Sequence, residues 1–243
     1  MNIIVFDIDG TLTHTNRVDG RCLAGAIGEV MPDRVPASFA DFPEMTDSAI
    51  LREICSDFDA TESREIESRV RDAFVARLEI ARAEDASDFS AVRGAPTVFD
   101  AVRSAGWTPA IATGGWRPSA EFKLHAAGIS FEGIASATAS EHRARTQIIQ
   151  QAVQDTTRGA TPTTVIYVGD GTWDIKACRE LGIGFIGRAE GAALQRLTGF
   201  GARAVLADFA SAESLVALLA EPRTLDLAVG SGPVMRGSIG PQT

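Results

Sequence analysis

Asp7 and Asp9 stand two residues apart at the end of the first apolar run of the chain, and a Gly10-Thr11 turn follows at once. Side chains at positions i and i+2 of an extended chain point to the same side, so both carboxyl groups can face one pocket at the carboxyl end of a strand. Two like charges held this close suit acid–base chemistry or the binding of a cation. The competing interpretation is a strand followed by an ordinary Asp-Gly turn, which is common in loops.

A second pair of acids, Asp170 and Asp174, follows a later apolar run that ends at Gly169. Ligands of an open parallel sheet bind at the carboxyl ends of its strands, so these acids can converge on the first pair. Four acids near one point repel each other without a cation. Hard oxygen ligands with room for water and phosphate oxygens suit Mg²⁺ rather than zinc. A nucleotide-binding glycine loop starting at Gly169 is disfavoured, because Asp174 stands where its third glycine belongs.

A third apolar run ends in Thr113-Gly114-Gly115, just before a helix start at Pro118. A hydroxyl followed by two glycines at that place offers hydrogen-bond donors to an anion, although a plain strand-to-helix turn explains it equally well. A positive partner for such an anion is available at the head of the next predicted helix. There the sequence carries Arg143 and Arg145.

The elements that must position these residues alternate along the chain. Short apolar runs that fit buried strands lie at residues 2–7, 107–112, 163–168, 183–187 and 203–206. Helical patterns lie at 95–105, 118–127, 144–154, 173–181, 190–197 and 211–220. This alternation predicts an α/β protein with a Rossmann-like parallel sheet covered by helices on both faces.

Residues 15–87 break the alternation, because they show helical periodicity without a convincing strand. Apolar side chains repeat at helical spacing from residue 66 to residue 81, and a shorter helix is predicted to open at Thr46 or Asp47. A helical insertion into the sheet domain is the simplest account. The end of the chain from about residue 222 is rich in Gly, Pro and Ser, which is typical of a mobile tail.

Composition narrows the class of protein. The chain has 243 residues, of which 45% are hydrophobic and 23% charged, as in a soluble globular protein, and no apolar run is long enough for a membrane span. A net charge of -9 argues against a broad nucleic-acid footprint. The three cysteines are too widely spaced for a zinc site or a disulfide framework, and the N-terminus has no signal-peptide pattern. We therefore expect a cytoplasmic enzyme in which a local positive group or a cation attracts any anionic substrate.

The order of these signals along the chain resembles the haloacid dehalogenase superfamily, and in particular its phosphoglycolate phosphatase-like members with a helical C1 cap. The matching residues are Asp7-Ile8-Asp9-Gly10-Thr11, then Thr113, then a basic residue, then Gly169-Asp170 with Asp174. The resemblance implies a catalytic core of residues 1–14 and 88–221, a cap of residues 15–87 and a tail of residues 222–243. By its position before Ile148-Ile149, Arg145 matches the basic residue better than Arg143.

The resemblance also implies a mechanism. Asp7 would attack phosphorus to form an aspartyl-phosphate, while Asp9 would protonate the leaving alcohol and later activate water. The expected Mg²⁺ contacts are Asp7, the backbone carbonyl of Asp9, Asp170, and Asp174 directly or through water. Hydrolytic dehalogenases of this superfamily lack a carboxylate at the second position and use no metal, so Asp9 favours phosphoryl transfer.

The same resemblance implies that Thr113, the Gly114 amide and Arg145 hold the phosphoryl oxygens. We expect a phosphatase acting on a small phosphorylated metabolite, for which phosphoglycolate and a sugar phosphate are both candidates. A phosphomutase and a non-catalytic member that binds a phosphate ligand or a partner protein are the alternatives. Residues 45–47 lie just before a predicted cap helix and are candidates for contact with substrate. Neither the substrate nor the oligomeric state follows from the sequence.

Overall fold

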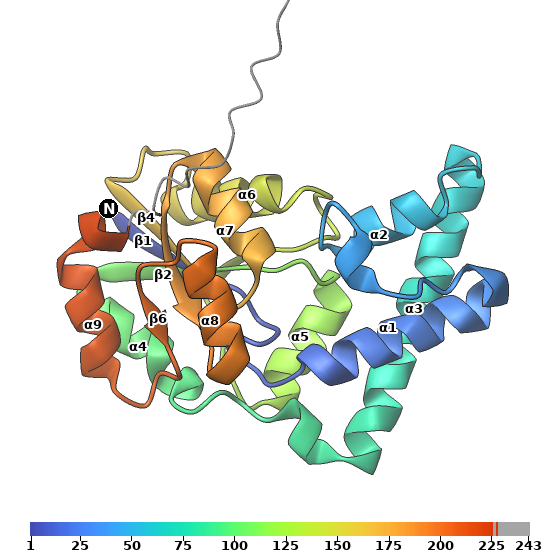
Figure 1. Ribbon diagram of the computed structural model, residues 1–243, viewed down its shortest axis with the longest axis horizontal. Helices are drawn as coiled ribbons and strands as arrows, with labels where there is room; N and C mark the ends of the chain where they lie inside the picture. The colour runs from blue at the N-terminus through green and yellow to red at the C-terminus, as the bar shows by residue number, and fades with distance from the viewer. Residues whose placement is uncertain (226, 228–243) are drawn as a thin grey trace, which may run out of the picture.

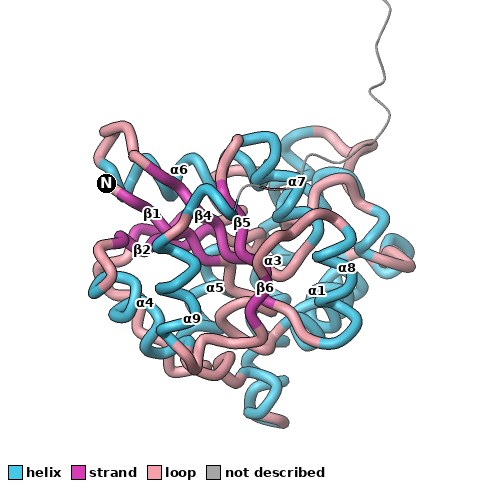
Figure 2. The backbone as a smooth tube through the Cα atoms, turned by 60° about the vertical axis from the view of Figure 1, so that its left-hand side comes forward, coloured by secondary structure: helices cyan, strands magenta, loops and turns pink. Residues whose placement is uncertain are grey.

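One six-stranded parallel sheet forms the centre of the protein, with the strand order β3-β2-β1-β4-β5-β6. The computed structural model describes residues 1–225 and 227. Figure 2 shows the strands lying side by side between layers of helices. The strands are β1 (Asn2–Phe6), β2 (Trp107–Ala112), β3 (Ala135–Ala137), β4 (Thr164–Gly169), β5 (Gly184–Arg188) and β6 (Val205–Leu206). The predicted α/β fold with a parallel sheet is confirmed.

Strand β1 is apolar on both sides because both faces of the sheet are covered. Ile3 and Val5 belong to the apolar cluster on one face, whereas Ile4 and Phe6 belong to the cluster on the other. In the register of the sheet, Phe6 pairs with Ile111 of β2 on one side and with Val168 of β4 on the other. The three strands therefore end at the same edge, and the residues that follow them meet there.

Helices cover the sheet on both faces. The first face is covered by α4 (Ala95–Ser104), α5 (Arg117–Ala126) and α9 (Ala212–Ala220), and the second by α6 (Arg145–Thr157), α7 (Thr172–Leu181) and α8 (Gly191–Gly199). Gly106, Gly128 and Gly182 follow the ends of α4, α5 and α7, and all three have positive φ, the conformation that ends a helix most readily at glycine.

The segment between β1 and α4 is helical, as the sequence predicted. It contains α1 (Asn16–Val30), α2 (Asp47–Ile54) and α3 (Ala60–Glu84), with short 3₁₀ turns at Pro32–Arg34, Phe39–Asp41 and Ala86–Phe89. Figure 1 shows these three helices beside the sheet rather than over it. The apolar residues spaced along α3 are buried and form its contact with α1: Ile66, Val70, Phe74, Leu78 and Ala81. The exact division of the chain into core and cap stays a prediction.

Two sequence predictions need correction. Strand β3 was not predicted, because Ala135-Ser136-Ala137 has no apolar run of its own and is a strand only through its pairing with β2. The predicted tail begins too early, since Pro222–Leu225 form a 3₁₀ turn and Leu225 is buried in the core. Most of the remaining predicted tail lies outside the described residues. Among the helices of the described chain, none is both long enough and apolar enough to cross a bilayer.

Candidate active site

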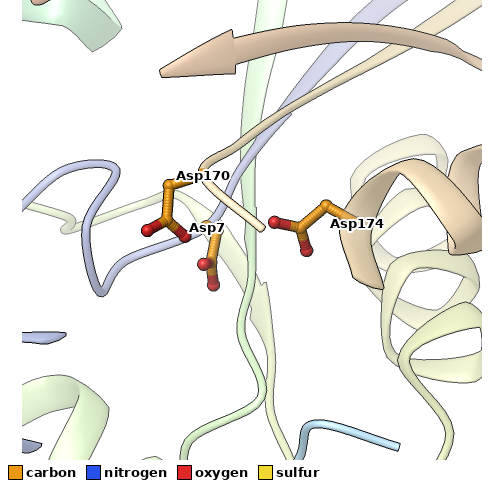
Figure 3. Close-up of side chains that lie close together, drawn as sticks. All are labelled: Asp7, Asp170 and Asp174. Carbon is orange, nitrogen blue, oxygen red and sulfur yellow. The ribbon is translucent and has the colours of Figure 1, made fainter. Parts of the chain in front are cut away.

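The carboxyl groups of Asp7, Asp170 and Asp174 converge at the carboxyl edge of the sheet (Figure 3). One oxygen atom from each lies within 4.8 Å of the other two. Asp7 directly follows β1 and Asp170 directly follows β4, whereas Asp174 lies in the first turn of α7. The backbone N–H of Gly171 donates to Asp174 Oδ2 at 2.9 Å and so fixes that side chain. The structure thus brings together three of the four acids that the sequence singled out.

Arg145 is the positive group beside these carboxylates. Its Nη1 lies 3.0 Å from Asp174 Oδ1 and 3.7 Å from Asp7 Oδ1. The same guanidinium donates to the Tyr167 hydroxyl and, through Nη2, to the Met45 backbone oxygen at 2.8 Å. Arg143, the second candidate from the sequence, is exposed and lines a separate crevice. Arg145, the first residue of α6, therefore lies at the site, whereas Arg143 does not.

The three carboxyl groups carry more negative charge than one guanidinium neutralises. Burial raises the pKa of Asp7 well above its usual value, and Arg145 only partly opposes this effect. Desolvation also raises the pKa of Asp170 to about 7, and it raises the pKa of Asp174 above its usual value. Within the described residues, Asp7 Oδ1 and Asp174 Oδ1 accept no hydrogen bond, and Arg145 is the one cation paired with them. Several carboxylate oxygens that share a single guanidinium at one point are the donor set that a divalent cation such as Mg²⁺ fits.

The side chain of Asp9 points away from this cluster. Its Oδ1 accepts a hydrogen bond from Thr15 Oγ1 at 2.5 Å, and its Oδ2 accepts one from Lys123 Nζ at 2.6 Å. About a fifth of the side chain stays exposed, at 19%, and it lines the central cavity. The Asp9 carboxyl group is therefore hydrogen-bonded outside the three-acid cluster, and a contact of Asp9 with a cation stays a prediction.

Lys123 lies at the centre of a second charged cluster, which sequence reasoning missed. Its ammonium group is fully buried and donates to Asp9 Oδ2 and to Asp19 Oδ1, each at 2.6 Å. Burial alone lowers the pKa of Lys123, but Asp19, Asp9 and Asp47 together raise it above its usual value. Burial raises the pKa of Asp19 to about 6 and that of Asp47 to about 8. A signal was available in the sequence, because Lys123 and Lys176 are the only lysines in an arginine-rich chain.

The loop after β2 contacts both the cluster and the inserted helices. Asp47 N–H donates to the Gly114 backbone oxygen at 2.8 Å, and Trp116 N–H donates to Asp47 Oδ2 at 2.9 Å. Within the described residues the Gly114 N–H itself has no hydrogen-bond partner, so it is available to an anion. A Cβ atom at Gly114 would lie 2.6 Å from both Arg145 Nη2 and the Met45 oxygen, so this position needs glycine.

A similar argument applies to the turn after Asp9. Gly10 has φ +73°, and a Cβ there would lie 2.1 Å from Asp170 Oδ2 and 2.2 Å from Asn16 Nδ2. Asn16, the first residue of α1, donates to Asp170 Oδ2 at 2.6 Å. No sequence signal marked Asn16, because an asparagine at a helix start is common.

One cavity of about 260 Å³ connects the two clusters. It is lined by all the residues predicted for catalysis and phosphate binding and by the predicted metal contacts apart from the buried Asp174. Trp173, Met45 and Asp47 line it as well. Thr46 lies outside it, since its hydroxyl donates to the Arg143 backbone oxygen. Trp116 is fully buried and packs in the core rather than forming a wall of the cavity.

Comparison with known proteins shows the family of the chain. The profile of the family described as haloacid dehalogenase-like hydrolases matches residues 1–182. The chain belongs to this family. Comparison with curated protein sequences finds no match for this haloacid dehalogenase-like hydrolase.

Several solved structures share the fold of this hydrolase. A hydrolase from Pseudomonas syringae is 18% identical with a TM-score of 0.67, covering 93% of this chain and 100% of its own. A mutant of CbbY from Rhodobacter sphaeroides, solved with xylulose-(1,5)bisphosphate, is 19% identical with a TM-score of 0.65, covering 93% and 99%. A putative beta-phosphoglucomutase from Bacteroides vulgatus is 17% identical with a TM-score of 0.62, covering 93% and 90%. At these sequence identities the similarity shows a shared fold alone.

Proposed function

We propose that this haloacid dehalogenase-like hydrolase is a Mg²⁺-dependent phosphatase that hydrolyses a small phosphate monoester through an aspartyl-phosphate on Asp7. The observation that carries the proposal is the convergence of Asp7, Asp170 and Asp174, each contributing an oxygen within 4.8 Å of the others. A separate carboxyl group, that of Asp9, faces the same cavity. Phosphate and a phosphorylated sugar are bound in structures of CbbY, which shares the fold.

Asp7 is the proposed nucleophile that attacks phosphorus. It lies directly after β1, and its N–H donates to the Val168 backbone oxygen at 3.0 Å, which fixes the residue in the sheet edge. A carboxylate about 4 Å from a phosphoryl group of charge near -2 meets a repulsion of roughly 8 kcal/mol at an effective dielectric of about 20. Arg145 and the free N–H of Gly114 offset part of this repulsion and stabilise charge on the phosphoryl oxygens.

A divalent cation would be held by Asp7, Asp170, Asp174 and the backbone carbonyl of Asp9. When bound, Mg²⁺ supplies positive charge that neutralises the phosphoryl oxygens and lowers the barrier to their approach. Side chains of the protein itself carry out the nucleophilic attack and the proton transfers.

Asp9 serves as acid and then as base. As Asp7 Oδ forms its bond to phosphorus, the bond from phosphorus to the ester oxygen breaks, and that oxygen takes the proton of the Asp9 carboxyl group. The resulting Asp9 carboxylate then takes a proton from a water molecule that attacks the aspartyl-phosphate, which releases phosphate and frees Asp7. The hydrogen bonds that the Asp9 carboxylate accepts from Thr15 and Lys123 hold it at the wall of the cavity.

The test is release of inorganic phosphate from an aryl phosphate, with and without Mg²⁺. We expect Asp7→Asn to abolish Mg²⁺-dependent release and Asp9→Asn to lower it by at least about 10²-fold, since general acid–base catalysis contributes about that much. Asp33→Asn is the matched control, because Asp33 is exposed outside the cavity. Wild-type activity in a folded Asp7→Asn variant contradicts the assignment of the nucleophile.

A phosphomutase would use the same residues, and the solved structures include a putative one with this fold. The two activities are separated by the product: a phosphatase releases phosphate from a sugar phosphate, whereas a mutase returns an isomer. We propose the phosphatase activity with a small phosphorylated metabolite as substrate. A cytoplasmic location remains our prediction from the sequence.

A further inference from the structure

The cavity has two chemically different ends. One end holds the reacting groups, with Asp7, Arg145 and the Gly114 loop. The other end is formed by the inserted segment and is lined by Asp19, Gly20, Leu23, Phe39, Asp47 and Ile50. An ester whose phosphoryl group lies against Asp7 must place its leaving alcohol toward the second end, which we call the alcohol end. At about 260 Å³ the whole cavity is small for a ligand pocket, so the alcohol must be small as well.

The alcohol end contains acids and apolar side chains but no cation. Among the described residues that line the cavity, Arg145 is the sole basic one, and it lies at the reacting end against Asp174. Lys123 does not line the cavity, and its ammonium group is already bonded to Asp9 and Asp19. A second phosphate or a carboxylate on the alcohol would therefore face Asp19 and Asp47 with no positive group to receive it.

Two acceptor atoms at the alcohol end are unused. Asp19 accepts from Lys123 through Oδ1, and Asp47 accepts from the Trp116 N–H through Oδ2. Within the described chain no donor reaches Asp19 Oδ2 or Asp47 Oδ1. Asp47 is only 6% exposed, and a polar group this deeply buried in a cavity wall gains most from a hydrogen-bond donor on the ligand.

From this arrangement, which rests on the proposed phosphatase function, we infer the class of substrate: a phosphate ester of a small alcohol that carries a hydroxyl or amino donor and no second anionic group. The donor bonds to Asp19 or Asp47, and the carbon chain lies against Leu23 and Ile50. Phosphoglycolate, one of the two candidates from the sequence, falls outside this class because its leaving alcohol carries a carboxylate.

Four esters of nearly equal size test the inference: 2-aminoethyl phosphate, 2-hydroxyethyl phosphate, n-propyl phosphate and phosphoglycolate. With Mg²⁺ present we expect kcat/KM for the first two to exceed that for phosphoglycolate by at least about tenfold. We expect n-propyl phosphate, which has no donor, to fall between them. The esters differ in intrinsic reactivity, so the decisive quantity is the change between enzyme variants in the ratio of kcat/KM for one ester to kcat/KM for another.

Asp47→Asn and Asp19→Asn supply that comparison. In assays at about pH 9, where both carboxyl groups are ionised, each change removes one negative charge while keeping the shape of the side chain. Each should then narrow the ratio of kcat/KM for 2-aminoethyl phosphate to that for phosphoglycolate by about three- to tenfold. Asp33→Asn, on the surface of the inserted segment, should leave the ratio unchanged. Thermal unfolding of each variant shows that it is folded under the assay conditions.

The outcomes separate this inference from the function on which it rests. Equal or better turnover of phosphoglycolate by the wild type overturns the inference, and so do ratios that neither Asp47→Asn nor Asp19→Asn alters. Either result leaves the phosphatase activity intact. Failure of all four esters and of an aryl phosphate to release phosphate overturns the proposed function, and this inference with it.

Discussion

Replacing Lys123 by methionine removes the cation from the charged cluster behind Asp9 while nearly preserving side-chain volume. Lys123 is fully buried and bonds two carboxylates at 2.6 Å, so the change leaves Asp9 and Asp19 facing each other without a counter-ion. Breaking a buried ion pair by removing one partner costs about 3–5 kcal/mol of folding free energy. That cost is a large part of the total stability of about 5–15 kcal/mol typical of a domain.

The loss should depend on pH. The pKa of Asp19 is about 6 with Lys123 beside it, and it rises further when the ammonium group is removed. Below that raised pKa the folded variant binds a proton that the folded wild type does not, so the variant's deficit shrinks as pH falls. Binding of this proton lowers the stability deficit of the variant by up to about 1.4 kcal/mol for each unit that the pH falls. We therefore expect the full deficit near pH 8 and a deficit smaller by about 1–3 kcal/mol near pH 5.5.

Urea unfolding of the wild type and Lys123→Met at both pH values measures this difference. Lys176→Met is the matched control, because Lys176 is the other lysine and is exposed, so its loss should change stability by no more than about 0.5 kcal/mol at either pH. A deficit for Lys123→Met below about 1 kcal/mol, or one that is equal at the two pH values, would refute the reasoning.

Three further perturbations address other parts of the site. Gly114→Ala should lower phosphate release by about 10²-fold with a small change in thermal stability, because the added methyl group displaces Arg145; unaltered release contradicts this. Asp47→Asn should gain stability over the wild type by about 1.4 kcal/mol per unit as pH rises toward 8. Because the pKa of Asp47 is raised in the folded state, protonation of Asp47 stabilises the folded wild type at low pH, and this stabilisation is lost as pH rises. If urea unfolding shows the same difference in stability between Asp47→Asn and the wild type at every pH, the raised pKa of Asp47 is wrong. Phe74→Ala in the buried stripe of α3 should cost about 3–5 kcal/mol, against at most about 0.5 kcal/mol for the exposed Ile80→Ala, and equal losses exclude a packing role.

Most of the fold of this protein could be predicted from local hydrophobic patterns in the sequence. The strands β1, β2, β4 and β5 were predicted because each is an apolar run with buried residues on both faces, and β6 was predicted from a shorter apolar run that is only half-buried. The stripe along α3 was predicted because burial on one side of a helix repeats every three to four residues. The positions of Asp7, Thr113 and Asp170 after strand ends implied a common site, since parallel strands present their carboxyl ends at one edge.

The tertiary structure decided what each of these residues contacts. Strand β3 exists because β2 pairs with it, and its own three residues carry no strand signal. The sequence favoured Arg145 over Arg143 by position, and the tertiary structure added its contact, in which Arg145 Nη1 lies 3.0 Å from Asp174 Oδ1. Lys123 is 114 residues from Asp9 in the sequence, and no local pattern marks them as partners.

The amino-acid sequence by itself determined the reacting end of the site, because the acids that hold it lie next to strand ends that hydrophobic periodicity locates. Only the tertiary structure decided the alcohol end, where Asp19 and Asp47 from the inserted segment meet Lys123 from the sheet domain. Such contacts join surfaces of separate elements, and their energies arise from burial and charge that exist only after those elements have packed.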